Sequence, residues 1–173
     1  DIGGTSTLSG NTILNFGIGN GALTSLYQKI GTSVHGILIN QVAANTVSYN
    51  SITSTTGTLT GSVTMCGILL GSTTASVQPD ANVSSCNFNT INLNNAAGFD
   101  TFGIWSRLAS ATSDKFLNNN IITIQNTTTT PIASRFMRGI WQDGNLRLLT
   151  ISENTVTLSY ENANNDHTIN FIQ

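Results

Sequence analysis

The stretch Leu117-Asn118-Asn119-Asn120-Ile121-Ile122-Thr123-Ile124 decides the fold, because its pattern returns along the whole chain. The pattern is an apolar residue, two residues of any kind, Asn, one residue of any kind, and then Ile or Val. It occurs five times, and the shared asparagines are Asn11, Asn50, Asn89, Asn120 and Asn154. They are 39, 39, 31 and 34 residues apart. Spacings in this range predict a repeat architecture.

A Gly-Ile pair lies between these asparagines and repeats with them. The glycines of the pair are Gly36, Gly67, Gly103 and Gly139, which are 31, 36 and 36 residues apart. Glycine is favoured where the backbone bends or where other atoms approach it closely. We therefore predict such a point once in every repeat.

The repeat unit is built from strands rather than helices. Apolar residues alternate with polar ones, as in Ile122-Thr123-Ile124, and β-branched Thr, Val and Ile are abundant. Short strands with one apolar face, returning every 31 to 39 residues, indicate a parallel β-helix with coils about 4.8 Å apart. We predict one domain over residues 1–173, with four to five coils. The variable lengths fall in loops at 16–34, 71–84, 106–114 and 126–134, with a short capping helix at 22–30.

In this fold the repeated asparagines can form a ladder inside the coils. An Asn at a bend between strands tolerates unusual backbone angles. Its amide can donate to the carbonyl of the Asn one coil away and accept from the other side, so that a polar side chain is tolerated in the interior.

Composition excludes several classes of partner. Only 8% of the residues are charged, the net charge is −2 with six basic residues, and 66 of the 173 residues are Ser, Thr or Asn. Nucleic acids require clustered Lys and Arg, which the chain lacks. No segment has the roughly 20 apolar residues of a membrane span. The last segment, 167–173, is apolar and strand-like, so we expect neighbouring domains in a longer chain.

The repeated asparagine pattern and the Gly-Ile pairs resemble those of the right-handed parallel β-helix superfamily over about residues 8–172. The Ser, Thr and Asn content and the low charge are similar to the repeat regions of large secreted or surface-attached bacterial proteins, such as those of gliding and adhesive Bacteroidetes. The resemblance implies a secreted or cell-surface location. It specifies fold better than function, because lyases, tailspikes, adhesins and some ice-binding proteins share such coils.

The candidate binding site is a pair of tryptophans, Trp105 and Trp141, each directly after the Ile of its Gly-Ile pair. If the coils stack in register, the two indoles lie one above the other, on the face where Leu38 and Leu69 stand in earlier coils. Such a pair suits the C–H face of a sugar ring. The alternative is that the rings form a second small core under the loops. Arg107, Arg138 and Asp143 lie nearby in the sequence and complete the candidate glycan site.

Catalytic and metal sites are less well supported by the sequence. Calcium needs six to eight oxygens, but the acidic residues are dispersed. A glycosidase needs two carboxylates about 5 to 9.5 Å apart, and Asp114 with Asp143 or Glu153 is the candidate pair for that distance. We expect no metal and no cofactor. His35 has no partner at a catalytic spacing, so we expect a structural role for it. Cys66 and Cys86 could pair in an oxidising compartment or be small buried hydrophobes.

These observations favour a non-catalytic structural or adhesive module. A rigid β-solenoid would present its loops and faces to glycans or to another surface protein. The alternative is a polysaccharide-degrading enzyme, a lyase or a glycoside hydrolase, acting on the surface of the coils. Two carboxylates and an arginine clustered on one exposed face would favour the enzyme.

Overall fold

The computed structural model describes residues 2–6, 8–14, 16, 29–30, 33–39, 45–55, 64–70, 84–95, 100–107, 110–127, 135–143, 146–161 and 167–172. These residues form sixteen strands, and no helix occurs among them. The described part therefore also contains no helix able to span a membrane.

The strands form three sheets, each with its neighbours in parallel apart from one short antiparallel pair. Sheet I contains, in order, β1 (Ile2–Gly3), β5 (Asn45–Ser48), β8 (Ser84–Asn87), β11 (Ser110–Asn118) and β14 (Leu146–Ser152). Sheet II contains β2 (Thr12–Leu14), β6 (Ser51–Thr55), β9 (Thr90–Asn95), β12 (Ile121–Asn126) and β15 (Thr155–Tyr160). Sheet III contains β3 (Lys29–Ile30), β4 (Ser33–Ile39), β7 (Thr64–Leu70), β10 (Asp100–Ser106), β13 (Arg135–Gln142) and β16 (His167–Ile172).

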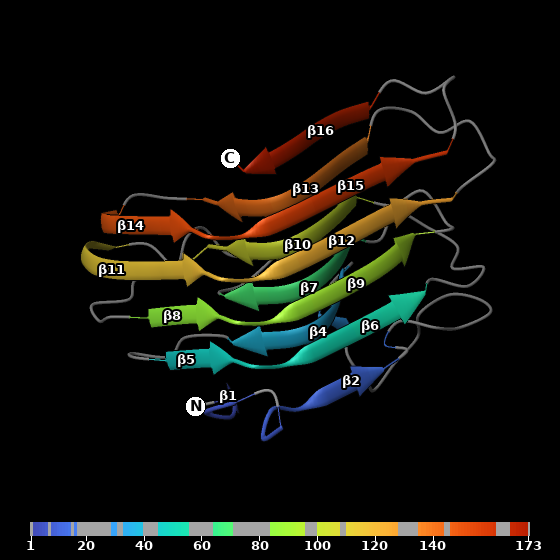
Figure 1. The fold of residues 1–173 in the computed structure, drawn as a ribbon. Coiled ribbons are helices and arrows are strands. Elements are labelled where there is room, and N and C mark those ends of the chain that lie inside the picture. Colours follow the sequence, from blue (N-terminus) through green and yellow to red (C-terminus); the bar gives the residue numbers. More distant parts are fainter. Residues whose placement is uncertain are drawn as a thin grey trace.

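The chain visits sheets I, II and III in turn and so winds into a right-handed parallel β-helix of about five coils. Figure 1 shows the coils stacked from the N-terminal β1 and β2 to the C-terminal β16, with the strands of sheet II in front of those of sheet III. The predicted fold class is confirmed, and the number of coils is at the upper end of the prediction.

The inward side chains of the three sheets pack into one continuous core. Equivalent residues of successive coils lie in register, as Ile52, Ile91 and Ile122 do on sheet II. All three are fully buried. Burial of such a column along the axis supplies the hydrophobic stabilisation that holds the coils together.

The predicted asparagine ladder is present and continuous. The side-chain nitrogen Nδ2 donates to Oδ1 of the next asparagine at 3.0 Å for Asn11–Asn50, 2.9 Å for Asn50–Asn89, 3.0 Å for Asn89–Asn120 and 3.0 Å for Asn120–Asn154. The three interior members are buried, whereas Asn11 is exposed and Asn154 is half-buried. The ladder runs along the corner between sheets I and II.

The expectation that the ladder asparagines adopt unusual backbone angles is wrong. The left-handed conformation belongs to the residue before the asparagine in four coils, with φ between 55° and 61° at Tyr49, Phe88, Asn119 and Glu153. That residue makes the corner, and the asparagine already leads into the next strand. The backbone carbonyl of the asparagine accepts a hydrogen bond from the first residue of the sheet II strand in the next coil, as when Thr90 N donates to Asn50 O. The rings of Tyr49 and Phe88 stack outside this corner with centroids 4.9 Å apart.

The Gly-Ile glycines mark the predicted close approach between sheets III and II. A Cβ at Gly103 would lie 2.5 Å from Cγ2 of Ile122 and 2.6 Å from the carbonyl oxygen of Gly139. At Gly67 the corresponding distances, to Ile91 Cγ2 and Gly103 O, are 2.6 Å and 2.7 Å. The alternation of inward and outward side chains restarts at this point. Met65 and Ile68 face the main core, while Cys66 and Leu69 face outward into a second cluster.

Two predictions for the connecting segments need correction. Residues 29–30 of the expected capping helix form strand β3, which pairs antiparallel with β4, and the rest of that helix lies outside the described residues. The loop expected at 106–114 is interrupted by β11, whose strand begins at Ser110. The first part of β11 pairs in parallel with β14, Ser110 with Leu146 and Asp114 with Leu148, so pairing with the next coil extends the strand beyond the apolar residues that mark it in the sequence.

Candidate functional site

The candidate site lies on the outer face of sheet III, where two rows of side chains run along the solenoid. One row is His35, Cys66, Phe102 and Arg138, and the other is Leu38, Leu69, Trp105 and Trp141. Cys66, Leu69, Phe102 and Trp105 are buried, and Leu38 and Trp141 pack against them partly buried. The outer face of this sheet therefore carries a second apolar cluster that includes the tryptophans. This agrees with the alternative prediction that the indole rings form a second small core.

The two indoles stack as predicted from the register of their strands. Trp105 on β10 pairs with Trp141 on β13, and their ring centroids are 4.7 Å apart with an angle of 15° between the planes. Phe102 lies against both, with centroids 4.8 Å from Trp105 and 5.2 Å from Trp141. Trp141 is the half-exposed member of the pair, while Trp105 is only 9% exposed.

Arg138 and Arg107 flank this stack. The guanidinium carbon of Arg138 is 4.1 Å from the Trp141 ring centroid and 4.4 Å from that of Phe136. Arg107 lies 5.0 Å from the Trp105 ring centroid. Such cation–π contacts are strongest where the cation is desolvated, and Arg138 is only 7% exposed. We call this group of Phe102, Trp105, Arg107, Arg138, Trp141 and Asp143 the aromatic–arginine cluster.

Two carboxylates complete the electrostatics of the cluster. Asp143 Oδ2 lies 3.3 Å from Nε of Arg107, and Asp100 Oδ1 accepts from the backbone N–H of Phe136 at 3.0 Å. Burial lowers the pKa of Arg138, and the charges of Asp100 and Asp143 partly offset that effect. Both carboxylates thus stabilise the charged form of the same buried guanidinium.

Two buried donors of the cluster are left unpaired by the described residues. Nε1 of Trp105 and Nε of Arg138 are buried, and neither has a hydrogen-bond partner within the part of the chain that the structure describes. A buried donor without an acceptor costs about 1 to 3 kcal/mol. A bound group with acceptor oxygens would recover that free energy.

No family model, curated protein or solved structure matches the chain.

The five residues predicted for the glycan site, Trp105, Trp141, Arg107, Arg138 and Asp143, all belong to the cluster. The sequence analysis did not include Phe102 in the site. The available signal was its position directly before Gly103, which is equivalent to the positions of His35 and Cys66 in other coils. Asp100 was also missed, because the sequence carries no signal for it; its role depends on Phe136 in the next coil.

Other candidates lie apart from the cluster. Asp114 is on sheet I, where Arg147 binds it through two hydrogen bonds of 2.7 Å and 2.6 Å, and this pairing lowers the pKa of Asp114. His35 is buried, which lowers its pKa to about 4, in keeping with the predicted structural role. Among the described residues, no group of three or more His, Cys, Asp or Glu side chains is placed to hold a metal ion.

The cysteines face different clusters. Cys66 belongs to the outer cluster of sheet III, whereas Cys86 lies in the main core in register with Val47, the small apolar place predicted for it. Both thiols are free, and burial raises the pKa of each. The interpretation of both as small buried hydrophobes therefore describes this structure better than the disulfide.

Proposed function

We propose that the chain is a non-catalytic module of a secreted or cell-surface protein, in which a rigid β-solenoid presents the aromatic–arginine cluster to a glycan. The observation that carries the proposal is the pair of buried donors, Trp105 Nε1 and Arg138 Nε, which lack a partner among the described residues and lie beside the half-exposed Trp141. Sugar hydroxyls and carboxylates supply acceptors for both donors. The apolar edge of an indole offers contact area to the C–H groups of the same ligand.

The solenoid supports this role mechanically. The cluster draws its residues from two neighbouring coils, and the main-chain pairing of β10 with β13 holds them in register. Binding groups held on paired strands lose little conformational freedom when a ligand arrives. The low charge and high Ser, Thr and Asn content support an extracellular location like that of bacterial adhesive repeats.

A glycan array tests the binding site. Trp141→Ala removes the half-exposed indole, and we expect it to lose at least about tenfold in affinity for any glycan that the wild type binds. Leu38→Ala is the matched control, because Leu38 occupies the same row in an earlier coil and is also half-buried. Circular dichroism and melting temperature show whether each variant is folded.

The double variant Trp105→Ala, Trp141→Ala completes the series, although the loss of buried Trp105 costs about 3 to 5 kcal/mol of stability on its own. If the wild type binds no glycan, or if Trp141→Ala and Leu38→Ala bind alike, the proposed site is wrong. Binding of a protein rather than a glycan at the same residues would change the partner class but keep the cluster as the contact surface.

The alternative function is a polysaccharide-degrading enzyme, and one observation favours it. Asp100 and Asp143 both lie near the Arg138 guanidinium, so two carboxylates and an arginine are grouped on one face. A glycosidase would use such carboxylates as acid and as base or nucleophile, and a lyase would use a base beside an acidic sugar. Release of reducing ends or of unsaturated sugars by the wild type, and its loss in Asp143→Asn, would establish this alternative.

A further inference from the structure

The outer face of sheet II is a regular array of uncharged side chains, most of them polar. Successive strands are in register, so outward residues fall into rows that cross the strands. One row is Thr12, Ser51, Thr90, Ile121 and Thr155, the next is Leu14, Thr53, Asn92, Thr123 and Thr157, and the third is Asn94, Gln125 and Ser159. Every member is a hydroxyl, an amide or an aliphatic side chain, and none is charged.

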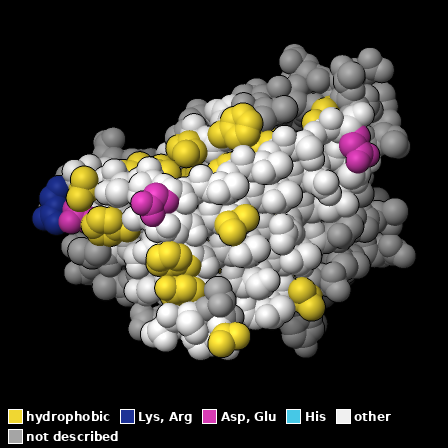
Figure 2. Space-filling view, in the orientation of Figure 1, with side chains coloured by type: hydrophobic (Ala, Val, Ile, Leu, Met, Phe, Trp, Pro, Cys, Tyr) yellow, Lys and Arg dark blue, Asp and Glu magenta, His cyan; other side chains and the backbone are white. Residues whose placement is uncertain are grey.

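This face is open to solvent. Thr157, Gln125 and Ser159 are exposed, and Thr53, Asn92 and Thr123 are half-buried. In Figure 2 the face formed by sheet II is mostly white, with isolated hydrophobic side chains on it and acidic groups only toward its two ends. Partners that bind through charge therefore find nothing to recognise over the central strands.

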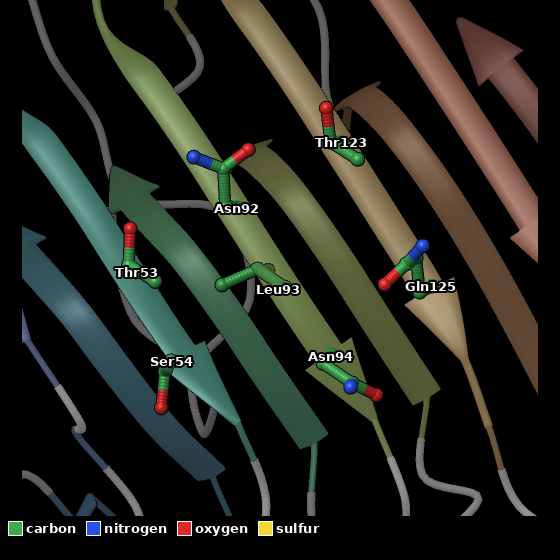
Figure 3. A pocket seen from close by; sticks show the side chains of 7 residues that line it. All are labelled: Thr53, Ser54, Asn92, Leu93, Asn94, Thr123 and Gln125. Atoms are coloured by element: carbon green, nitrogen blue, oxygen red, sulfur yellow. The ribbon is translucent and has the colours of Figure 1, made fainter.

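A shallow hollow of about 280 Å³ crosses the array. Its lining includes Thr53 on β6, Asn92 and Asn94 on β9, and Thr123 and Gln125 on β12. Figure 3 shows these side chains standing along three neighbouring strands. The hollow therefore runs across the strands, in the direction of the solenoid axis.

The array is rigid because the ladder positions each strand. Ser51, Thr90, Ile121 and Thr155 each follow a ladder asparagine directly, so the hydrogen bonds between asparagines set the register of the outward residues. The inward residues Ile52, Ile91 and Ile122 anchor the same strands in the core. Side chains held in this way form hydrogen bonds with a ligand at a small entropic cost.

We propose that this face binds a neutral polysaccharide chain laid along the hollow, parallel to the solenoid axis. Hydroxyls and amides repeat once per coil, about every 4.8 Å, and a polymer of neutral sugars repeats hydroxyls along its own length. Each neutral hydrogen bond contributes little, so affinity comes from several contacts made together. A small sugar reaches too few rows to bind well. The site shares no residue with the aromatic–arginine cluster, and either can fail without the other.

The test compares Thr123→Arg with Thr150→Arg. Arginine at position 123 fills the hollow, whereas Thr150 is an equally half-buried threonine on sheet I. The probes are a β-linked glucan, a mannan and a xylan as neutral polymers, a polyuronate as the acidic one, and the matching disaccharides. We expect the wild type and Thr150→Arg to be retarded by at least one neutral polymer in affinity electrophoresis, and Thr123→Arg to lose about tenfold or more of that affinity.

Two further readouts separate this site from others. Binding to a neutral polymer should not change between about 0.1 and 1 M salt, over which the Debye length falls from about 10 to 3 Å. Binding to the neutral polymer should also persist in Trp141→Ala, the variant that removes an indole of the aromatic–arginine cluster on sheet III. The proposal is overturned if no neutral polymer binds, if Thr123→Arg binds like Thr150→Arg, or if disaccharides bind as tightly as polymers. Ice shaping by the wild type without polysaccharide binding would also overturn it and assign the array to ice.

Discussion

A ladder asparagine is a buried polar residue whose groups are all used. Asn89 donates from its backbone N and from Nδ2 to Oδ1 of Asn120, both at 3.0 Å, and from Nδ2 to the carbonyl of Val47 at 2.8 Å. Its own Oδ1 accepts from the backbone N and Nδ2 of Asn50, at 3.0 Å and 2.9 Å. The amide is therefore compatible with the core because each coil supplies the partner that the next one needs.

Replacing Asn89 by Leu should lower the free energy of unfolding by about 3 to 5 kcal/mol. It removes the acceptor of the buried Asn50 N–H and the side-chain donor to the Val47 carbonyl, while Asn50 Nδ2 keeps only the carbonyls of Ile2 and Ser48. Asn11→Leu is the control, since Asn11 is the exposed first member of the ladder and has one neighbouring ladder asparagine, Asn50, where Asn89 has two. We expect it to cost less than about 1 kcal/mol. Urea unfolding measures both, and equal costs would show that the ladder adds nothing beyond ordinary packing.

His35 makes stability depend on pH. Burial lowers its pKa from 6.5 to about 4 in the folded state, so between these pH values the unfolded chain binds a proton that the folded chain does not. Stability is therefore fully present above pH 6.5 and falls as the pH drops toward 4, by up to about 3 kcal/mol. In His35→Phe, which places there the residue type of Phe102, this slope should disappear from urea unfolding curves between pH 7 and pH 4. An unchanged slope would assign it to other groups.

At the scale of the strand, the Gly-Ile pair allows sheet III to approach sheet II. A methyl group at Gly103 would meet both the Ile122 side chain and the Gly139 carbonyl at 2.5 to 2.6 Å. The Gly139 carbonyl oxygen belongs to β13, a strand paired with its neighbours, and cannot move without disturbing the main-chain hydrogen bonds between these strands. The glycine is thus a requirement of packing between two elements rather than of its own backbone angles.

Gly103→Ala should therefore destabilise the fold by about 1 to 3 kcal/mol or more, the range for overpacking a core. Combining it with Ile122→Ala removes the contact with Cγ2 but leaves the one with the carbonyl. The double variant should cost less than the sum of the two single changes, yet more than Ile122→Ala alone. Thermal melts of the four proteins give this comparison. Strict additivity would mean that the methyl group of the alanine does not press on the Ile122 side chain.

The sequence predicts those elements whose residues recur, and fails where one coil depends on another. The ladder, the glycines and the stacked indoles could be predicted because coil stacking brings identical positions together. The corner residue could not, because Tyr49, Phe88, Asn119 and Glu153 have no residue type in common and only the path of the backbone gives them a positive φ. The start of β11 and the role of Asp100 likewise depend on partners one coil away.

At the scale of the whole molecule, the core is shielded from solvent to different degrees along the solenoid axis. Leu117, Ile122 and Ile124 are fully buried, but their equivalents in the last coil, Ile151, Val156 and Leu158, are only half-buried. In a solenoid each coil is stabilised by its neighbours, and a coil with one neighbour lacks half of those contacts. Local opening should therefore start in the last coil of this chain rather than in the middle.

Hydrogen exchange followed by mass spectrometry tests this gradient. We expect the slowest exchange in β9 and β12, which pair with strands on both sides, and exchange faster by about tenfold or more in β15, which has one partner in its sheet. Asn89→Leu interrupts the ladder between these regions, so it should speed exchange in β9 and β12 far more than in β15. If β15 is protected as well as β9, each coil is held by its own interior packing and the stack is not cooperative along its axis.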